Sequence, residues 1–231
     1  MKVTVEAITQ PLIKIPTHGD LVVERCMTPN EYIAYAARIS NPDNQMNTET
    51  APKLLKYLYN HRHWSPFQMI SANIKIQTTR DISHQIIRHW SFDDVGNANL
   101  QEFSQRYAQA TGFEIRECRI QDAKNRQNSI ESSNNWLSEW WVTEQQIIID
   151  KAKFAYDTAL RLGIAKEQAR AILPEGLTQT TFIMAGTMRS WIHYCQIRSQ
   201  NDVQKEHRLI ARECWTRLLE HFPDLEGLVT W

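Results

Sequence analysis

Residues 85–107 combine basic, acidic and hydroxyl side chains that could bind a phosphorylated, planar ligand. Arg88 and His89 are adjacent, and Gln85 precedes Arg88 by three residues, which places both on one face of a helix. Residues 101–107, QEFSQRY, add a carboxylate, a hydroxyl and another guanidinium. The planar guanidinium of arginine suits phosphate oxygens and planar imides better than lysine does. The pattern predicts a local site for a phosphorylated, hydrogen-bonding ligand.

Three further arginines, Arg170, Arg189 and Arg198, lie in or beside segments with many apolar or small residues. Such surroundings are less typical of a solvated charge face. For any one arginine taken alone, a surface ion pair remains the simpler interpretation. Together with the segment at 85–107, they indicate a site built from several parts of the chain.

Charge and cysteine usage exclude several other classes of protein. Lysine plus arginine and aspartate plus glutamate each total 26, so no global positive field favours a nucleic-acid partner. Cys26, Cys118, Cys195 and Cys214 have no CxxC spacing, and the histidines form no HExxH pattern, so we expect no metal site. The start of the chain lacks a signal-peptide pattern, and no segment has the length and apolarity of a membrane span. These features favour a reduced, cytoplasmic protein.

The hydrophobic periodicity predicts a single domain, residues 1–231, of α/β or α+β class. Strands are expected near residues 1–6, 70–76 and 178–184, and helices near 28–40, 48–60, 79–87, 133–162, 165–173, 189–199 and 203–221. Residues 91–99 contain turn formers without periodicity and predict a loop. The tryptophan-rich helix at 133–162 is expected to be scaffold or an oligomer contact, and a core helix is an equal alternative.

These residues resemble a family, the flavin-dependent thymidylate synthases. The similarity includes Gln-x-x-Arg-His at 85–89 and Glu-x-Ser-x-Arg-Tyr at 102–107. Further similar segments follow in the family's order and lie at residues 36–40, 63–67, 169–174, 189–193 and 198. The resemblance spans about residues 30–215.

The sequence departs from the family pattern at two points. Trp90 stands where the family usually has arginine, and the segment between Trp90 and Ser104 is longer than in the family. An indole at this position exchanges a cation for an aromatic ring that can stack. One alternative is therefore a flavin- or nucleotide-binding module of the same type that has lost turnover. A nucleotide hydrolase is another alternative, and it would need a metal site.

The resemblance implies an enzyme that methylates dUMP to dTMP. Methylenetetrahydrofolate would be the carbon donor, FAD reduced by NADPH would supply the hydride, and no enzyme cysteine would attack the uracil. The implied fold is a twisted, mostly antiparallel sheet flanked by helices. The implied assembly is a homotetramer whose active sites are shared between subunits.

The resemblance also implies roles for individual residues. The residues expected to surround dUMP are Gln85, Arg88, Glu102, Ser104, Arg106, Arg170 and Arg198. Arg198 would polarise the uracil imide and is the expected catalytic residue. The residues expected to bind FAD are His63, Ser65, Arg88, His89, Glu102, Thr187, Arg189 and His193.

Overall fold

The computed structural model describes residues 1–17, 23–90, 99–110 and 112–231, and the side chains of His89 and Trp90 are outside this description. The chain forms two compact units. The first unit consists of Met1–Lys2, Ile76–Ile183 and Gln200–Ile210. The second unit consists of Val3–Lys75, Met184–Ser199 and Ala211–Trp231. The expectation of a single domain over residues 1–231 stays an expectation, and each unit is described by itself.

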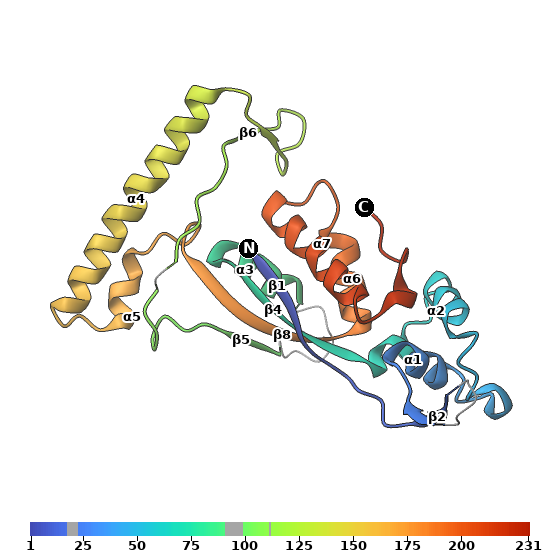
Figure 1. Ribbon diagram of the computed structural model, residues 1–231. Coiled ribbons are helices and arrows are strands. Elements are labelled where there is room, and N and C mark those ends of the chain that lie inside the picture. Colours follow the sequence, from blue (N-terminus) through green and yellow to red (C-terminus); the bar gives the residue numbers. More distant parts are fainter. Residues whose placement is uncertain (18–22, 91–98, 111) are drawn as a thin grey trace. The chain divides into compact units, whose positions relative to one another are not determined.

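The main sheet has four strands in the order β1-β4-β8-β5 (Figure 1). The strands are β1 (Lys2–Ile8), β4 (Ser71–Thr79), β8 (Gln179–Thr187) and β5 (Leu100–Glu102). In β4 the alternation Ala72, Ile74, Ile76 is buried, as expected for a strand with one face on the core. Two antiparallel hairpins complete the strands: β2 (Lys14–Pro16) with β3 (Glu24–Cys26), and β6 (Arg119–Gln121) with β7 (Ser129–Glu131). The mixed helix and sheet class predicted from the sequence is confirmed.

The second unit packs helices around aromatic side chains. Its helical elements include α1 (Pro29–Ala37), α2 (Ala51–Asn60), α6 (Met188–Arg198) and the short 3-10 helices η1 (Pro42–Asn44), η2 (Ser65–Met69) and η4 (Pro223–Leu225), and it also contains β2, β3, most of β1 and the first part of β4. Helix α1 packs against α2 and η2, and η2 packs against α6. Trp191, Phe67 and Phe222 are fully buried, and Trp191 Nε1 donates to the Ala72 carbonyl at 3.0 Å. This core places the polar face of α6 beside the residues that follow α2.

The first unit contains helices that border the expected nucleotide site. They are α3 (Arg80–Trp90), α4 (Asn135–Arg161), α5 (Lys166–Ala169) and η3 (Arg170–Ile172), and the unit also includes the beginning of α7 (Lys205–Leu219). Ile82 and Ile86 of α3 are fully buried, one helical turn apart. Gln85 and Arg88 lie on a different, less buried face of α3.

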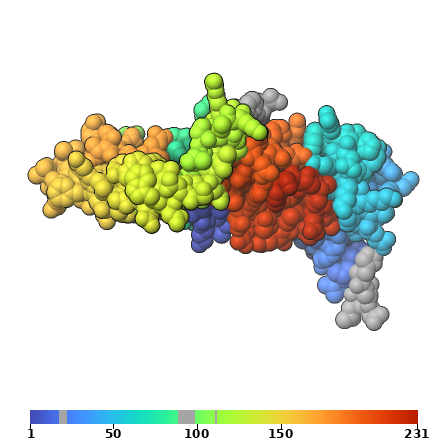
Figure 2. All heavy atoms as spheres, turned by 90° about the horizontal axis from the view of Figure 1, so that it is seen from above, coloured from blue at the N-terminus to red at the C-terminus, as the bar shows by residue number. Residues whose placement is uncertain are grey.

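The surface of α4 is unusually apolar for an exposed helix. It packs mainly against α5 and η3, its Gln145 also bonds the Arg116 backbone, and it presents a long face to solvent (Figure 2). Trp136 and Phe154 are each 70% exposed, and Trp140 and Ile147 are also exposed. The interpretation of 133–162 as a core helix is therefore wrong for these side chains, because they have no cover within the described chain.

Most expected elements occur, and the structure adds five short strands that were not expected, β2, β3, β5, β6 and β7. Helix α2 begins at Ala51, and its N-cap residue Thr50 makes no side-chain capping bond; the Thr50 hydroxyl accepts a hydrogen bond from Arg38 Nη2 at 2.7 Å. The helix expected at 165–173 is only a short α5 that continues as η3. The expected loop at 91–99 lies almost entirely outside the described residues. No helix in the described part of the chain combines the length and apolarity needed to cross a membrane.

Candidate active site

Glu102 is the most firmly oriented of the expected site residues. Its Oε1 accepts hydrogen bonds from Ser83 Oγ at 2.9 Å and from Thr180 Oγ1 at 2.8 Å. Arg80 Nη1 lies 3.9 Å from the same oxygen. Ser83 is on α3 and Thr180 is on β8, so these contacts join the end of β5 to both elements. A carboxylate with its orientation fixed in this way can serve a ligand without a search for the productive rotamer.

Two of the expected arginines share one acidic neighbour. Arg106 Nε lies 3.6 Å from the Glu167 carboxylate, and Arg170 Nε donates to the Glu167 backbone carbonyl at 3.3 Å. The Ser104 hydroxyl accepts a hydrogen bond from the Arg106 amide at 3.4 Å. The turn after β5 and the junction of α5 with η3 therefore bring Ser104, Arg106 and Arg170 into one neighbourhood. Only Arg106 faces the Glu167 carboxylate, whereas Arg170 contacts the neutral backbone carbonyl, so the two guanidinium groups together leave a positive balance suited to a phosphate.

Gln85 and Arg88 lie on α3 as the three-residue spacing predicts. Gln85 is half-buried, and Arg88 is exposed near the end of the helix. Gln85 Nε2 donates to Gln204 Oε1 at 2.7 Å. The predictions that involve His89 and Trp90 concern side chains outside the described part of the chain.

Glu206, in the first turn of α7, is the centre of an ionic cluster behind Gln204. Arg119 Nη2 donates to its carboxylate, and Arg116 Nη1 lies 3.2 Å from it. Arg116 also donates to Asp81 Oδ1 of α3 at 2.8 Å. Burial alone would raise the pKa of Glu206, but the hydrogen bond from Arg119 and the charge of Arg116 outweigh it and lower the pKa to about 2. Glu206 is therefore anionic at any physiological pH.

Replacing Glu206 by glutamine is expected to lower the free energy of unfolding by about 3 kcal/mol near neutral pH, since about 2.5 pKa units separate the folded and unfolded values. A depressed carboxylate pKa stabilises the fold above the unfolded pKa, and this contribution disappears as pH falls from about 4.5 to 2. Urea unfolding of wild type and Glu206→Gln at pH 6, 4.5 and 3 measures it. A difference that stays constant with pH would contradict the assignment.

In the second unit, α6 carries three of the residues expected to bind the flavin. Thr187 is the N-cap of α6, and its Oγ1 accepts from the Ser190 amide at 3.3 Å. Arg189 and His193 are exposed and four residues apart, so they share one face of the helix. Thr187 therefore has a structural role as a cap, whereas Arg189 and His193 lie on an exposed face of the helix.

His63 and Ser65 lie beside α6 within the same unit. Both are exposed, at the junction between α2 and η2, and η2 packs against α6. The Met188 amide, at the start of α6, donates to the Ile70 carbonyl at 2.8 Å, which fixes the two segments together. His63, Ser65, Arg189 and His193 are thus exposed residues on or next to two elements of the second unit that pack together. Such donors suit the phosphates and polar ring edges of a dinucleotide.

Arg198 ends α6 and is half-buried. Burial raises the pKa of the neighbouring Tyr194 hydroxyl, and the positive charge of Arg198 opposes this effect, so the two groups are within electrostatic reach. Burial also raises the pKa of the Cys195 thiol and of the Cys214 thiol. Neither buried thiol is an activated nucleophile, because a reactive cysteine needs a lowered pKa and access to substrate.

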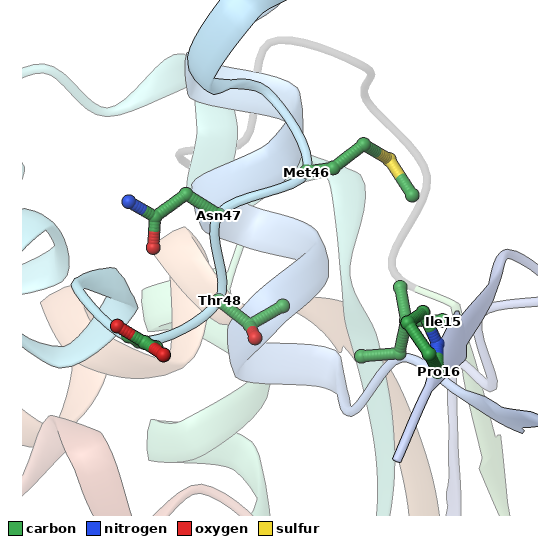
Figure 3. Close-up of a pocket in the computed structure, with 6 residues that line it drawn as sticks. Ile15, Pro16, Met46, Asn47 and Thr48 are labelled. Atoms are coloured by element: carbon green, nitrogen blue, oxygen red, sulfur yellow. The ribbon is translucent and has the colours of Figure 1, made fainter. Parts of the chain in front are cut away.

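Two cavities in the second unit are lined by other residues. One, of about 300 Å³, lies where Ile15 and Pro16 face Met46, Asn47 and Thr48 (Figure 3). The other, of about 430 Å³, is lined by parts of α1, α2 and η4 together with the residues that precede them. None of the residues expected to bind nucleotide or flavin lines either cavity. Neither cavity enters the assignment of the site.

Sequence reasoning missed the side chains that orient the expected ones. Ser83 and Thr180 hold Glu102, and Gln204 contacts Gln85 across 119 positions of the chain. No local pattern marks such partners, because the contacts form only when distant segments pack. The sequence offered one local indication of this region: Glu206 is an acidic residue in the first turn of a helix, where negative charge is favourable.

Comparison with known proteins identifies the family. The family described as "Thymidylate synthase complementing protein" matches residues 21–224. A probable flavin-dependent thymidylate synthase of Paramecium bursaria Chlorella virus 1 is 44% identical over 91% of this chain and 94% of its own length. The flavin-dependent thymidylate synthase of Synechocystis sp. is 42% identical over 93% of this chain and 96% of its own length.

A solved structure shares the fold. It is the UMP/dUMP methylase PolB from Streptomyces cacaoi bound with 5-Br dUMP, with a TM-score of 0.76 at 18% identity, covering 98% of this chain and 93% of that chain. The fold and the sequence matches thus define an enzyme of the thymidylate synthase complementing type. The chain belongs to the flavin-dependent thymidylate synthase family, and the resemblance stated from its motifs is confirmed.

Proposed function

We propose that this enzyme converts dUMP to dTMP, with methylenetetrahydrofolate as the methylene donor and NADPH as the reductant of bound FAD. The observation that carries the proposal is the family match over residues 21–224. The arrangement of Glu102, Ser104, Arg106 and Arg170 within one unit supports it. These side chains supply a fixed acceptor, a hydroxyl and two cations, which are the groups that a nucleoside monophosphate requires.

The nucleotide site divides into groups for the phosphate and groups for the sugar and base. Arg106 and Arg170, which share Glu167, are proposed to bind the phosphate together with Ser104. Gln85, Arg88 and Glu102 are proposed to orient the rest of dUMP by hydrogen bonds. Arg198 is proposed to donate to the uracil imide. A fixed cation at this edge favours the anionic form of the ring and activates it for attack on the methylene donor.

The residues proposed for FAD fit a dinucleotide cofactor. His63, Ser65, Arg189 and His193 are exposed polar residues of the second unit, and their side chains can donate to phosphate oxygens. Arg88, His89 and Glu102 are proposed as further contacts, and Thr187 as a contact through the start of α6. Bound FAD would supply the hydride of the reaction. The task of the protein is then to bind the cofactor and the substrates, to orient them and to exclude water from the site.

Thymidylate synthesis by this enzyme is expected to survive the loss of either buried thiol. Cys195→Ala and Cys214→Ala should retain dTMP formation while costing about 1–2 kcal/mol of unfolding free energy, because both side chains are packed in the core. Initial rates of dTMP formation and urea unfolding measure the two effects. Loss of turnover in a variant that still folds and retains flavin would instead indicate a cysteine nucleophile.

We also propose a cytoplasmic homotetramer with shared active sites. Support for self-association comes from α4. Its exposed side chains Trp136, Trp140, Ile147 and Phe154 would be removed from contact with water if they were buried in a subunit interface. Light scattering during gel filtration should give four times the mass of one chain. Trp136→Glu with Phe154→Glu should shift the elution towards smaller species, and an unshifted wild-type-like tetramer would exclude this face as the contact.

A growth experiment tests the proposed function. The gene should restore growth without thymidine to a bacterium that lacks its own thymidylate synthase. The alternative, a flavin- or nucleotide-binding module that has lost turnover, predicts a protein that binds flavin but does not restore growth. Expression of the chain in the test strain, verified by its flavin absorbance after purification, separates these outcomes from a failure to fold.

A further inference from the structure

A chain of hydrogen bonds runs from the ionic cluster at the start of α7 to Gln85. Gln204 immediately precedes α7, and its backbone carbonyl accepts from the Arg208 amide at 2.9 Å, as the residue at a helix N-cap does. Its side-chain Nε2 donates to Glu206 Oε2 at 3.0 Å, and its Oε1 accepts from Gln85 Nε2 at 2.7 Å. All of these residues belong to the first unit.

The direction of this chain is fixed by chemistry. Glu206 is a carboxylate whose other oxygen is bound by Arg119 and approached by Arg116, so it can only accept. Gln204 must therefore turn its NH₂ group to Glu206 and its oxygen to Gln85. Gln85 must in turn present its NH₂ group to Gln204. The orientation of both amides follows from the charge at one end.

His207 contacts the oxygen of the Gln85 amide, whereas Gln204 contacts its nitrogen. It is fully buried, and its Nδ1 lies 3.4 Å from Gln85 Oε1. The Gln85 amide therefore has a partner at its nitrogen and at its oxygen. An amide nitrogen carries two N–H groups and an amide oxygen has two lone pairs. One bond to each atom fixes the amide plane while retaining one donor and one acceptor for a ligand.

We propose that Gln204 is a positioning residue for nucleotide binding, acting through Gln85, with Glu206 and its two arginines as the anchor. This inference rests on the proposed function, since it requires that Gln85 contacts dUMP. Gln204 then affects the affinity for dUMP and the KM for dUMP, and leaves flavin binding unchanged. Pre-orientation strengthens binding because the ordering of the side chain is complete before the ligand arrives.

A double-mutant cycle tests the proposal on the flavin-loaded enzyme. Gln204→Met keeps the side-chain length but removes both amide bonds, and calorimetry with dUMP gives the dissociation constant. We expect an increase of about tenfold in the wild-type background and of less than about twofold in a Gln85→Ala background. Steady-state kinetics should show a raised KM for dUMP with a kcat near that of wild type. Gln127→Met, an exposed glutamine in the turn between β6 and β7, is the matched control.

The outcomes separate a positioning role from a structural one. An equal loss in both backgrounds would overturn the proposal, because the effect would then not pass through Gln85. An unchanged affinity in Gln204→Met, or in Gln85→Ala, would also overturn it. Gln204→Ala removes the same amide, and it replaces Gln204→Met in the test if Gln204→Met loses flavin or unfolds at a lower urea concentration than wild type. Failure of the wild-type enzyme to bind dUMP would refute the proposed function itself before any variant is compared.

Discussion

Arg198→Ala is expected to lower dTMP formation by a factor on the order of 10³, because the variant lacks the cation proposed to stabilise developing charge on the uracil. Arg198 is at the end of α6, where half-burial limits screening by water. Its removal should have little effect on flavin retention, since the proposed flavin contacts on α6 are Thr187, Arg189 and His193. Rates of dTMP formation and the flavin absorbance of the purified protein measure the two quantities.

Two control variants sharpen this result. Arg198→Lys keeps a positive charge but loses the planar fork, so its rate should lie between wild type and Arg198→Ala. Arg161→Ala removes an exposed arginine from the last turn of α4 and should leave turnover unchanged. Near-normal turnover in Arg198→Ala would refute the catalytic role of Arg198.

Glu102→Ala is expected to lower turnover by a factor on the order of 10², because the variant lacks the fixed carboxylate that is proposed to orient the nucleotide. The fold should also lose stability. Ser83 and Thr180 are buried, and each hydroxyl would lose its acceptor at a cost of about 1–3 kcal/mol. Turnover at saturating dUMP and urea unfolding measure the two effects.

Glu102→Gln provides the matched comparison. Its amide oxygen can still accept hydrogen bonds from Ser83 and Thr180. Glu102→Gln should therefore recover most of the unfolding free energy that is lost in Glu102→Ala. The missing negative charge near Arg80 should keep turnover below that of wild type. Equal turnover in Glu102→Ala and wild type would remove Glu102 from the proposed site.

The sequence predicted those elements whose local signals agree. Thr28 caps α1, and Glu31 reaches back to the Thr28 amide at 2.7 Å, as the spacing of a capping box requires. The period-two pattern of β4 gives way to helical spacing at Arg80, where α3 begins. Both features can be read from a few neighbouring residues.

Features that depend on distant contacts were not predictable. The strands β6 and β7 have only three residues each, and such short strands carry no alternation to detect. The tryptophans of α4 have helical spacing, but spacing does not say whether they face a core or solvent. At the site, Gln85 and Glu102 could be named from the motif, whereas Ser83, Thr180 and Gln204 follow only from tertiary packing.

The proposed function is tested most directly by an anaerobic assay of purified, flavin-free enzyme with dUMP, methylenetetrahydrofolate, NADPH and added FAD, in which dTMP is identified by mass. The proposed function predicts dTMP in the complete mixture and none when FAD, NADPH or methylenetetrahydrofolate is left out. Enzyme that binds both flavin and dUMP yet forms no dTMP in the complete mixture would contradict it.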